Sequence, residues 1–346
     1  MNLRYLSAIV RRYSCGIVLA YLVLLIGCSG ESQEYEFNDF TTEKLKVITT
    51  VSPITSLVEN IGGVKIELEG IVPEGTNSHT FAPSPSVVRT LSEADLIVVN
   101  GLFLEEPSIR LAEDNKKSQT KILSLAEKTV SPEEWIFDFA FPSSGGKPNP
   151  HLWTAPHLGI IYAELIKDEL ASLDEKNRSY YEDNYEKLSL RLLDLDQRIT
   201  KAVHTIPEDN RKLLTYHDSF PYFAPRYGFE IIGAIQPSDF TEPSARDVAE
   251  LIDLVKSTNV PAIFGSEVFP SPVMKQVAKE GGAQYIDKLR DDDLPGRVGD
   301  PLHSYMGLIV TDVEVIVLAL GGSIEALNGF DARNVFEGDS KAIYPQ

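Results

Sequence analysis

Short apolar runs alternate with helix-length segments along most of this chain, and this alternation constrains its fold more than any other feature. The runs cover residues 45–51, 66–72, 95–101 and 121–125, then 212–217, 230–235, 261–266 and 283–288. Runs of four to eight residues separated by helix-length segments are typical of parallel sheets built from βα units. Because about 300 residues are too many for one comfortable core, we predict an α/β fold with two lobes, each a parallel β-sheet flanked by helices.

A different pattern lies between the two series of runs. Apolar and aromatic residues recur there at spacings of four and three, namely Tyr181, Tyr185, Leu188, Leu192, Leu195 and Ile199. This spacing places them on one stripe of a single helix. We predict one long linking helix at residues 173–206, roughly 45 Å long, that joins an N-terminal lobe (45–172) rigidly to a C-terminal lobe (207–346).

The N-terminus indicates the compartment. Three arginines precede an apolar run over residues 16–27 that ends at Cys28. A basic region followed by an apolar run is typical of a signal peptide, and about a dozen residues are too few for a bilayer that needs roughly 20. We therefore predict a signal peptide at residues 1–27.

The sequence LIGC at residues 25–28 resembles a bacterial lipobox, in which the cysteine sulfur is acylated. An ordinary secretory signal with a chance cysteine is the alternative. Polar and mostly acidic residues follow, so we predict a lipidated tether at residues 28–44. The expected location is extracytoplasmic, on a membrane through the lipid of Cys28, in the periplasm or at the cell surface.

The net charge and the cysteine content exclude several classes of partner and of metal site. Removal of residues 1–27 would take away three arginines and no acid, so the formal charge would change from −19 to −22. Such an acidic surface disfavours nucleic acid, and we expect no nucleic-acid partner. Cys15 and Cys28 are the two cysteines of the chain, which leaves the predicted folded body without a disulfide or a thiolate metal site.

Three histidines follow strands or lie in proline-bounded loops: His79 in GTNSHTFAPSPS, His151 in KPNPHLWTAP and His217 in KLLTYHDSF. Ligands of α/β proteins gather at the carboxyl ends of strands, where we also place Asp287, after the run AQYI. Histidines with one carboxylate suit a first-row transition metal. Glu267 also lies just past a strand end and is a candidate hydrogen-bond acceptor for a ligating histidine.

Motifs of catalysis are missing from the sequence. It has no H-E-x-x-H, G-x-S-x-G or Walker A pattern, and no G-x-G-x-x-G after a strand. Four protein ligands would also fill a tetrahedral zinc site, whereas a catalytic site keeps one position open for water. We therefore expect a binding protein and not an enzyme.

Taken together, these motifs resemble the zinc- and manganese-binding solute-binding lipoproteins of ABC importers, in which a long helix joins two lobes. The resemblance covers nearly the whole chain. It implies that GTNSHTFAPSPS supplies the ligand His79, NPHLWTAP the ligand His151 and HDSFPYFAPRYGFE the ligand His217. It also implies a fourth ligand, an aspartate after the last strand, with which Asp287 aligns.

Three departures from the family pattern stand out. Asn149 replaces the usual acid two residues before His151, and residues 131–150 lack the histidine-rich loop that zinc members often carry. The acidic run Asp291 to Asp293 competes with Asp287 as the source of the carboxylate. We expect surface or capping roles for the other histidines, His157, His204 and His303.

The resemblance implies that a monomer captures one divalent metal ion per chain and delivers it to the membrane permease of an ABC importer. Zinc is favoured, because three imidazoles and a carboxylate suit tetrahedral zinc, whereas manganese, the alternative, prefers more oxygen donors. Two other classes stay open. One is a secreted zinc hydrolase with Glu267 or Asp218 as its base, and the other is an adhesin stabilised by a metal ion.

Overall fold

The computed structural model describes residues 44–236, 243–266, 271–339 and 341–345. The predicted signal peptide, Cys28 and the tether up to residue 43 lie outside the described residues, as does Glu267. No helix in the described part of the chain has the length and apolar character needed to cross a membrane.

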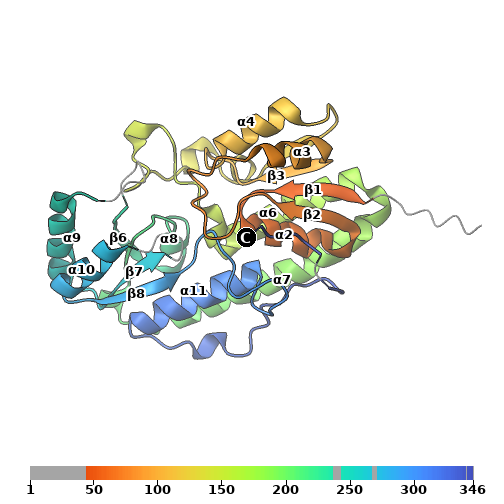
Figure 1. The fold of residues 1–346 in the computed structure, drawn as a ribbon. Coiled ribbons are helices and arrows are strands. Elements are labelled where there is room, and N and C mark those ends of the chain that lie inside the picture. Colours follow the sequence, from red (N-terminus) through yellow and green to blue (C-terminus); the bar gives the residue numbers. More distant parts are fainter. Residues whose placement is uncertain (1–43, 237–242, 267–270, 340, 346) are drawn as a thin grey trace, which may run out of the picture. The chain divides into compact units, whose positions relative to one another are not determined.

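The first sheet confirms the four N-terminal strands of the prediction. They are β1 (Leu45–Thr49), β2 (Ile66–Gly70), β3 (Leu96–Val99) and β4 (Lys121–Ser124). All pairs are parallel, in the order β2-β1-β3-β4. Helix α2 (Ser52–Gly62) covers one face, while α3 (Pro85–Glu93) and α4 (Glu106–Asn115) lie beside the other (Figure 1). Burial on both faces explains why β3 is apolar at every position.

The second sheet confirms the four C-terminal strands. They are β5 (Lys212–Thr215), β6 (Glu230–Ala234), β7 (Ala262–Ser266) and β8 (Gln284–Leu289), parallel in the order β6-β5-β7-β8. Helices α9 (Ala245–Thr258) and α10 (Pro272–Gly281) lie beside it, and α8 (Phe223–Tyr227) and α11 (Tyr305–Ala319) complete this lobe. In each sheet the first strand lies between the second and third, so each has a switch point at its carboxyl edge, where such folds bind ligands.

Shorter elements connect these layers. They are α5 (Ala126–Thr129) and the 3-10 turns η1 (Gly63–Lys65), η2 (Pro132–Glu134), η3 (Ser143–Gly145), η4 (Leu152–Thr154), η5 (Glu175–Asn177), η6 (Glu208–Asn210) and η7 (Glu325–Leu327).

One long helix, α7 (Arg178–Val203), joins the two lobes as predicted. It begins later than the expected range because α6 (Pro156–Leu173) ends at Asp174, whose φ of −136° is not helical, and η5 follows. Five of the six residues of the predicted stripe are buried, while Tyr185 is partly buried.

Helix α7 is attached to both lobes by buried polar groups. Near its start, Asn184 Nδ2 donates to the carbonyl oxygen of Ile61 in α2, at 3.0 Å. Near its end, Asp196 accepts from Arg226 and from the hydroxyl of Tyr227 in α8, each at 2.7 Å. One apolar core also includes residues of both sheets and of α7. The lobes therefore share a common support, which opposes a large hinge motion.

We predict that Asp196→Ala lowers the free energy of unfolding by about 1–3 kcal/mol, because the buried Tyr227 hydroxyl loses its acceptor. Urea denaturation measures this loss. Asp194→Ala is the matched control, since Asp194 pairs with Arg198 on the exposed face of the same helix and such pairs contribute about 1 kcal/mol or less. Equal losses for the two variants would contradict the proposed attachment.

Candidate metal centre

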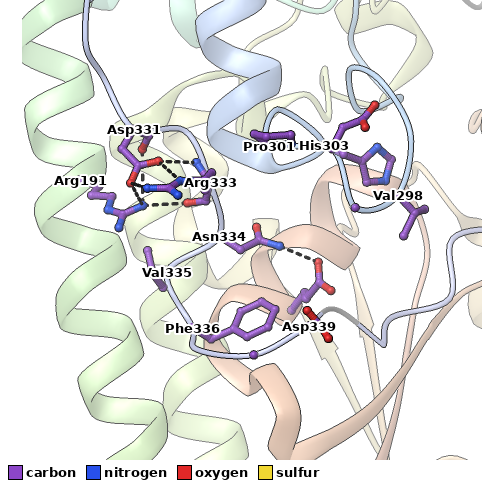
Figure 2. A pocket seen from close by; sticks show the side chains of 14 residues that line it. Arg191, Val298, Pro301, His303, Asp331, Arg333, Asn334, Val335, Phe336 and Asp339 are labelled. Atoms are coloured by element: carbon purple, nitrogen blue, oxygen red, sulfur yellow. Dashed lines mark hydrogen bonds and ion pairs between the residues drawn. The ribbon is translucent and has the colours of Figure 1, made fainter.

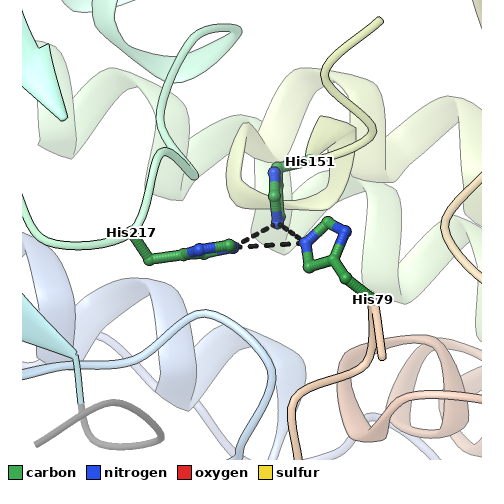
Figure 3. A group of neighbouring side chains, drawn as sticks. All are labelled: His79, His151 and His217. Carbon is green, nitrogen blue, oxygen red and sulfur yellow. Dashed lines mark hydrogen bonds between the residues drawn. The ribbon is translucent and has the colours of Figure 1, made fainter. Parts of the chain in front are cut away.

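Three histidines from separate segments converge between the lobes. His79 lies in the loop between β2 and α3, His151 precedes η4, and His217 follows β5 by two residues. Their Nε2 atoms are 3.2 Å (79 to 151), 3.3 Å (79 to 217) and 3.0 Å (151 to 217) apart, and Figure 3 shows the rings directed at a common point. Within the described residues this is the single cluster of at least three metal-ligating side chains.

Two amide side chains orient two of these rings. The Nδ1 of His151 is 2.6 Å from Asn149 Oδ1, and the Nδ1 of His217 is 2.7 Å from Gln236 Oε1. An amide oxygen can only accept, so each Nδ1 carries the proton and each Nε2 of a neutral ring carries a lone pair. Two lone pairs thus face each other at 3.0 Å. This pair is repulsive unless a cation or a donated proton lies between the two nitrogens.

The size of the nitrogen triangle suits a metal ion. Bonds of about 2.0–2.1 Å to zinc place nitrogens of a tetrahedral site about 3.3 Å apart, with the ion about 0.7 Å outside their plane. The observed separations of 3.0–3.3 Å agree with this geometry. Three imidazoles can therefore bind one ion without a large rearrangement, and one coordination position stays available for a further donor.

Burial keeps the histidines neutral, which is the state that binds metal. Burial is the main cause that lowers the pKa of His79 and of His151 well below the usual value, and a charge on His217 would lower both further. Burial also lowers the pKa of His217, although the hydrogen bond with Gln236 opposes this shift. Protonation of the three imidazoles is therefore disfavoured, and their nitrogens stay able to bind a metal ion.

Asp291 supplies a carboxylate beside this group. Its Oδ2 is 3.6 Å from Nε2 of His217, and the side chain is buried. Its carbonyl oxygen accepts from Trp153 Nε1 at 2.8 Å, and Ser266 Oγ donates to its Oδ1 at 3.3 Å. Burial, together with the charge of Asp293, raises the pKa of Asp291 to about 7. Buried carboxylates next to neutral imidazoles create a strong preference for a cation.

Asp287, the expected carboxylate ligand, is not among the converging side chains of the described residues, whereas Asp291 lies beside His217. Strand β8 continues for two residues beyond Asp287, to Leu289, and the side chain of Asp287 is exposed. The strand end therefore lies nearer to the acidic run, and it brings Asp291 to His217. Asp292 is buried next to it, and burial with the charge of Asp291 raises the pKa of Asp292 to about 7.

The remaining candidates lie elsewhere. His204 is exposed, as expected, and His157 is partly buried. His303 is buried at 5% exposure and Ser304 caps the following helix, so the expected surface or capping role of His303 is wrong. Asp218 is buried behind His217, where its Oδ2 accepts from the backbone N–H of Ala140 at 3.0 Å.

Two pockets help to locate the site in the molecule. A pocket of about 730 Å³ is lined by His303, Arg191, Arg333 and Asn334 and by none of the three converging histidines (Figure 2). A second pocket, of about 480 Å³, has His79 in its lining, with Phe103 and Phe141. Of the three histidines, His79 is the one that lines the second pocket.

Sequence reasoning assigned no supporting role to three residues that shape this centre. Gln236 follows β6 at the same carboxyl edge as His217, so the rule that found the histidine could also have found the glutamine. Asn149 is a departure from the family pattern, but the structure shows that it keeps the hydrogen bond an acid would make to His151. Trp153 binds the Asp291 backbone, a long-range contact without a local signal.

Two parallel-sheet lobes with a shared long helix and a buried histidine cluster define the class of two-lobed, metal-binding solute-binding proteins. The sequence model of the family "Zinc-uptake complex component A periplasmic" matches residues 47–319, and the chain belongs to this family. This confirms the resemblance to the zinc- and manganese-binding lipoproteins of ABC importers.

Individual relatives agree with this assignment. The chain is 32% identical over 292 residues to the metal ABC transporter substrate-binding lipoprotein FimA of Streptococcus parasanguinis, covering 84% of this chain and 93% of FimA. It is 30% identical over 296 residues to the manganese ABC transporter substrate-binding lipoprotein PsaA of Streptococcus pneumoniae, covering 84% and 93%. The solved periplasmic zinc-binding protein TroA of Treponema pallidum has a TM-score of 0.72 at 25% identity, covering 80% of this chain and 99% of TroA.

We predict that Gln236→Ala weakens the affinity for a divalent metal ion about 10- to 100-fold, because the ring of His217 loses the partner that orients it. Competition against a chelator of known affinity measures the change. Gln284→Ala, at an exposed position of β8, is the control and should leave the affinity unchanged. An unaltered affinity for Gln236→Ala would show that this hydrogen bond does not support the site.

Proposed function

We propose that this chain captures one divalent transition-metal ion outside the cytoplasm and delivers it to the membrane permease of an ABC importer. The ligands in this proposal are His79, His151, His217 and Asp291. The observation that carries it is the convergence of three Nε2 atoms, two of which present lone pairs to each other. Family membership supports the transport role.

Zinc is the metal that we favour. Three imidazole nitrogens and one carboxylate oxygen match the donor set and the four-coordinate geometry of zinc, whereas manganese prefers more oxygen donors. The relatives' names include both metals, since PsaA is called a manganese protein and TroA a zinc protein. Asp292 is the residue that would add oxygen donors for manganese, because it is buried next to Asp291. A competition titration with both metals decides between them.

The anchor belongs to the same proposal. A signal peptide at residues 1–27 and acylation of Cys28 would hold a monomer at the membrane through the tether 28–44, close to the permease. The names of FimA and PsaA, both called lipoproteins, support this part. Mass spectrometry of the mature N-terminus tests it, because an acylated cysteine adds the mass of its fatty acids.

We predict that the purified protein takes up about one equivalent of zinc and becomes more stable, since a ligand at 100 times its dissociation constant adds about 2.7 kcal/mol when it binds only the native state. His217→Ala should remove most of this gain, because it deletes one corner of the nitrogen triangle. His204→Ala replaces an exposed histidine and is the matched control. An unchanged melting temperature of the unaltered protein in excess zinc would contradict the proposed function.

We also predict that metal binding releases more protons at pH 6 than at pH 8. Burial raises the pKa of Asp291 to about 7, so this carboxyl is mostly protonated at pH 6 and ionised at pH 8 in the metal-free protein. A bound cation favours the ionised form and displaces the proton. Calorimetry in buffers of different ionisation enthalpy counts the protons.

Asp291→Asn serves as the comparison for this measurement. Its amide has no proton to lose in this range, so the difference between pH 6 and pH 8 should shrink. Proton release that is equal at the two pH values in the unaltered protein would show that the carboxylate stays ionised without metal.

A further inference from the structure

The C-terminal tail, residues 341–345, makes backbone contacts with the segment that carries His79. Ile343 forms a parallel bridge beside β2, where its N–H donates to Leu68 O and its carbonyl oxygen accepts from Gly70 N, both at 2.9 Å. Two residues further on, Pro345 O accepts from the N–H of Glu74 at 3.1 Å. The tail thus extends the first sheet by a short edge segment and continues into the loop that leads to His79.

Gly70 lies between α2 and the tail. A Cβ placed on Gly70 would lie 2.9 Å from Thr55 Oγ1, closer than real Cβ atoms come, and 3.6 Å from the carbonyl oxygen of Ile343. The backbone of Gly70 is therefore enclosed between α2 on one side and the tail on the other. The tail occupies a fitted position at the end of β2, where the loop of His79 begins.

The same tail contacts the segment that carries Asp291. Tyr344 is buried and forms a small apolar cluster with Leu294 and Leu308. Leu294 follows Asp291 by three residues, and between them Asp293 accepts from the N–H of Gly75 at 2.8 Å. The tail, the loop of His79 and the acidic run therefore meet at Glu74 and Gly75.

Buried polar groups of α2 hold the tail in this place. The hydroxyl of Tyr344 donates to Glu59 Oε2 at 2.9 Å, and Asn334 Nδ2 donates to the same oxygen at 3.0 Å. Asn334 in turn accepts from Asn60 Nδ2 at 2.8 Å. Figure 2 labels Asn334 among the side chains of this region. The final segment of the chain is thus hydrogen-bonded to α2 and to β2 of the first lobe.

We propose that residues 341–345 act as a positioning strap, which holds the segments of His79 and Asp291 in register and so slows the release of the metal ion. This inference rests on the proposed function of the site. The strap contacts two ligand-bearing segments from different lobes, through backbone hydrogen bonds to one and through the side chain of Tyr344 to the other. Because α7 and the shared core oppose a hinge motion, loosening this joint offers a local way to open one side of the metal site.

The test compares two substitutions at one position of the full chain. Ile343→Pro removes the N–H that pairs with Leu68, whereas Ile343→Ala keeps this hydrogen bond and alters only a side chain that is 56% exposed. Zinc-loaded protein is mixed with an excess of chelator, and the rate of zinc release is followed. We expect release about tenfold faster for Ile343→Pro, the lower end of the effect of losing support around a metal site, and an unchanged rate for Ile343→Ala.

Amide hydrogen exchange separates positioning from a general loss of stability. For Ile343→Pro we expect faster exchange in residues 71–79, with unchanged protection in α7 and unchanged urea unfolding of the metal-free protein. If Ile343→Pro unfolds, Tyr344→Phe decides, because it removes only the hydroxyl that binds Glu59 and should still accelerate release.

The outcomes distinguish the two proposals. Failure of the unaltered protein to take up zinc would contradict the proposed function. Uptake of zinc by the unaltered protein, with equal release rates for Ile343→Pro and Ile343→Ala, would overturn the strap alone. The strap is also overturned if Ile343→Pro is unfolded and Tyr344→Phe releases zinc at the unaltered rate.

Discussion

The mutual approach of three imidazole nitrogens is the constraint on which the rest of this structure depends. The neutral rings of His151 and His217 present lone pairs to each other at 3.0 Å and repel each other, so the surrounding protein must hold them together. Asn149 and Gln236 do this directly by accepting from the far side of two rings. Asn149 Nδ2 also donates to the backbone oxygen of Asp218 at 2.7 Å, which ties the loop of His151 to the segment of His217.

The frame around this cluster explains how a site between two lobes can be rigid. Helix α7 contributes to one core that includes residues of both sheets, and its polar contacts reach α2 through Asn184 and α8 through Asp196. A ligand that closes two mobile lobes must offset the cost of ordering them, whereas here the lobes are already joined. Metal capture and release then depend on short segments, of which the loop of His79 has one face toward a pocket.

The buried carboxyl groups around the histidines determine the charge of the ligand that the site prefers. Burial raises the pKa of Asp291 and Asp292 and lowers that of the histidines, so it shifts each of these groups toward its neutral form. A divalent ion reverses this for the carboxylates and leaves the imidazoles neutral. Three imidazole nitrogens and one nearby carboxylate are the physical basis of the proposed preference for zinc.

Much of this could be predicted from local patterns. The eight apolar runs and the stripe of α7 follow from burial on both faces of a sheet and on one side of a helix, which depend on near neighbours in sequence. The three histidines were predictable because β5 and the loops end where α/β proteins bind ligands. The choice of Asp287 assumed that β8 ends there, but the pairing of β8 with β7 continues to Leu289.

The sequence by itself therefore determined the α/β class, the order of the strands along the chain, the long helix and three histidines that the fold brings together. Only the tertiary structure decided which carboxylate reaches them, that Gln236 and Trp153 support them, and that Tyr344 lies against Leu294. Those contacts join residues from 19 to more than 130 positions apart. Apolar periodicity records whether a residue is buried, but it carries no information about which distant segment it meets.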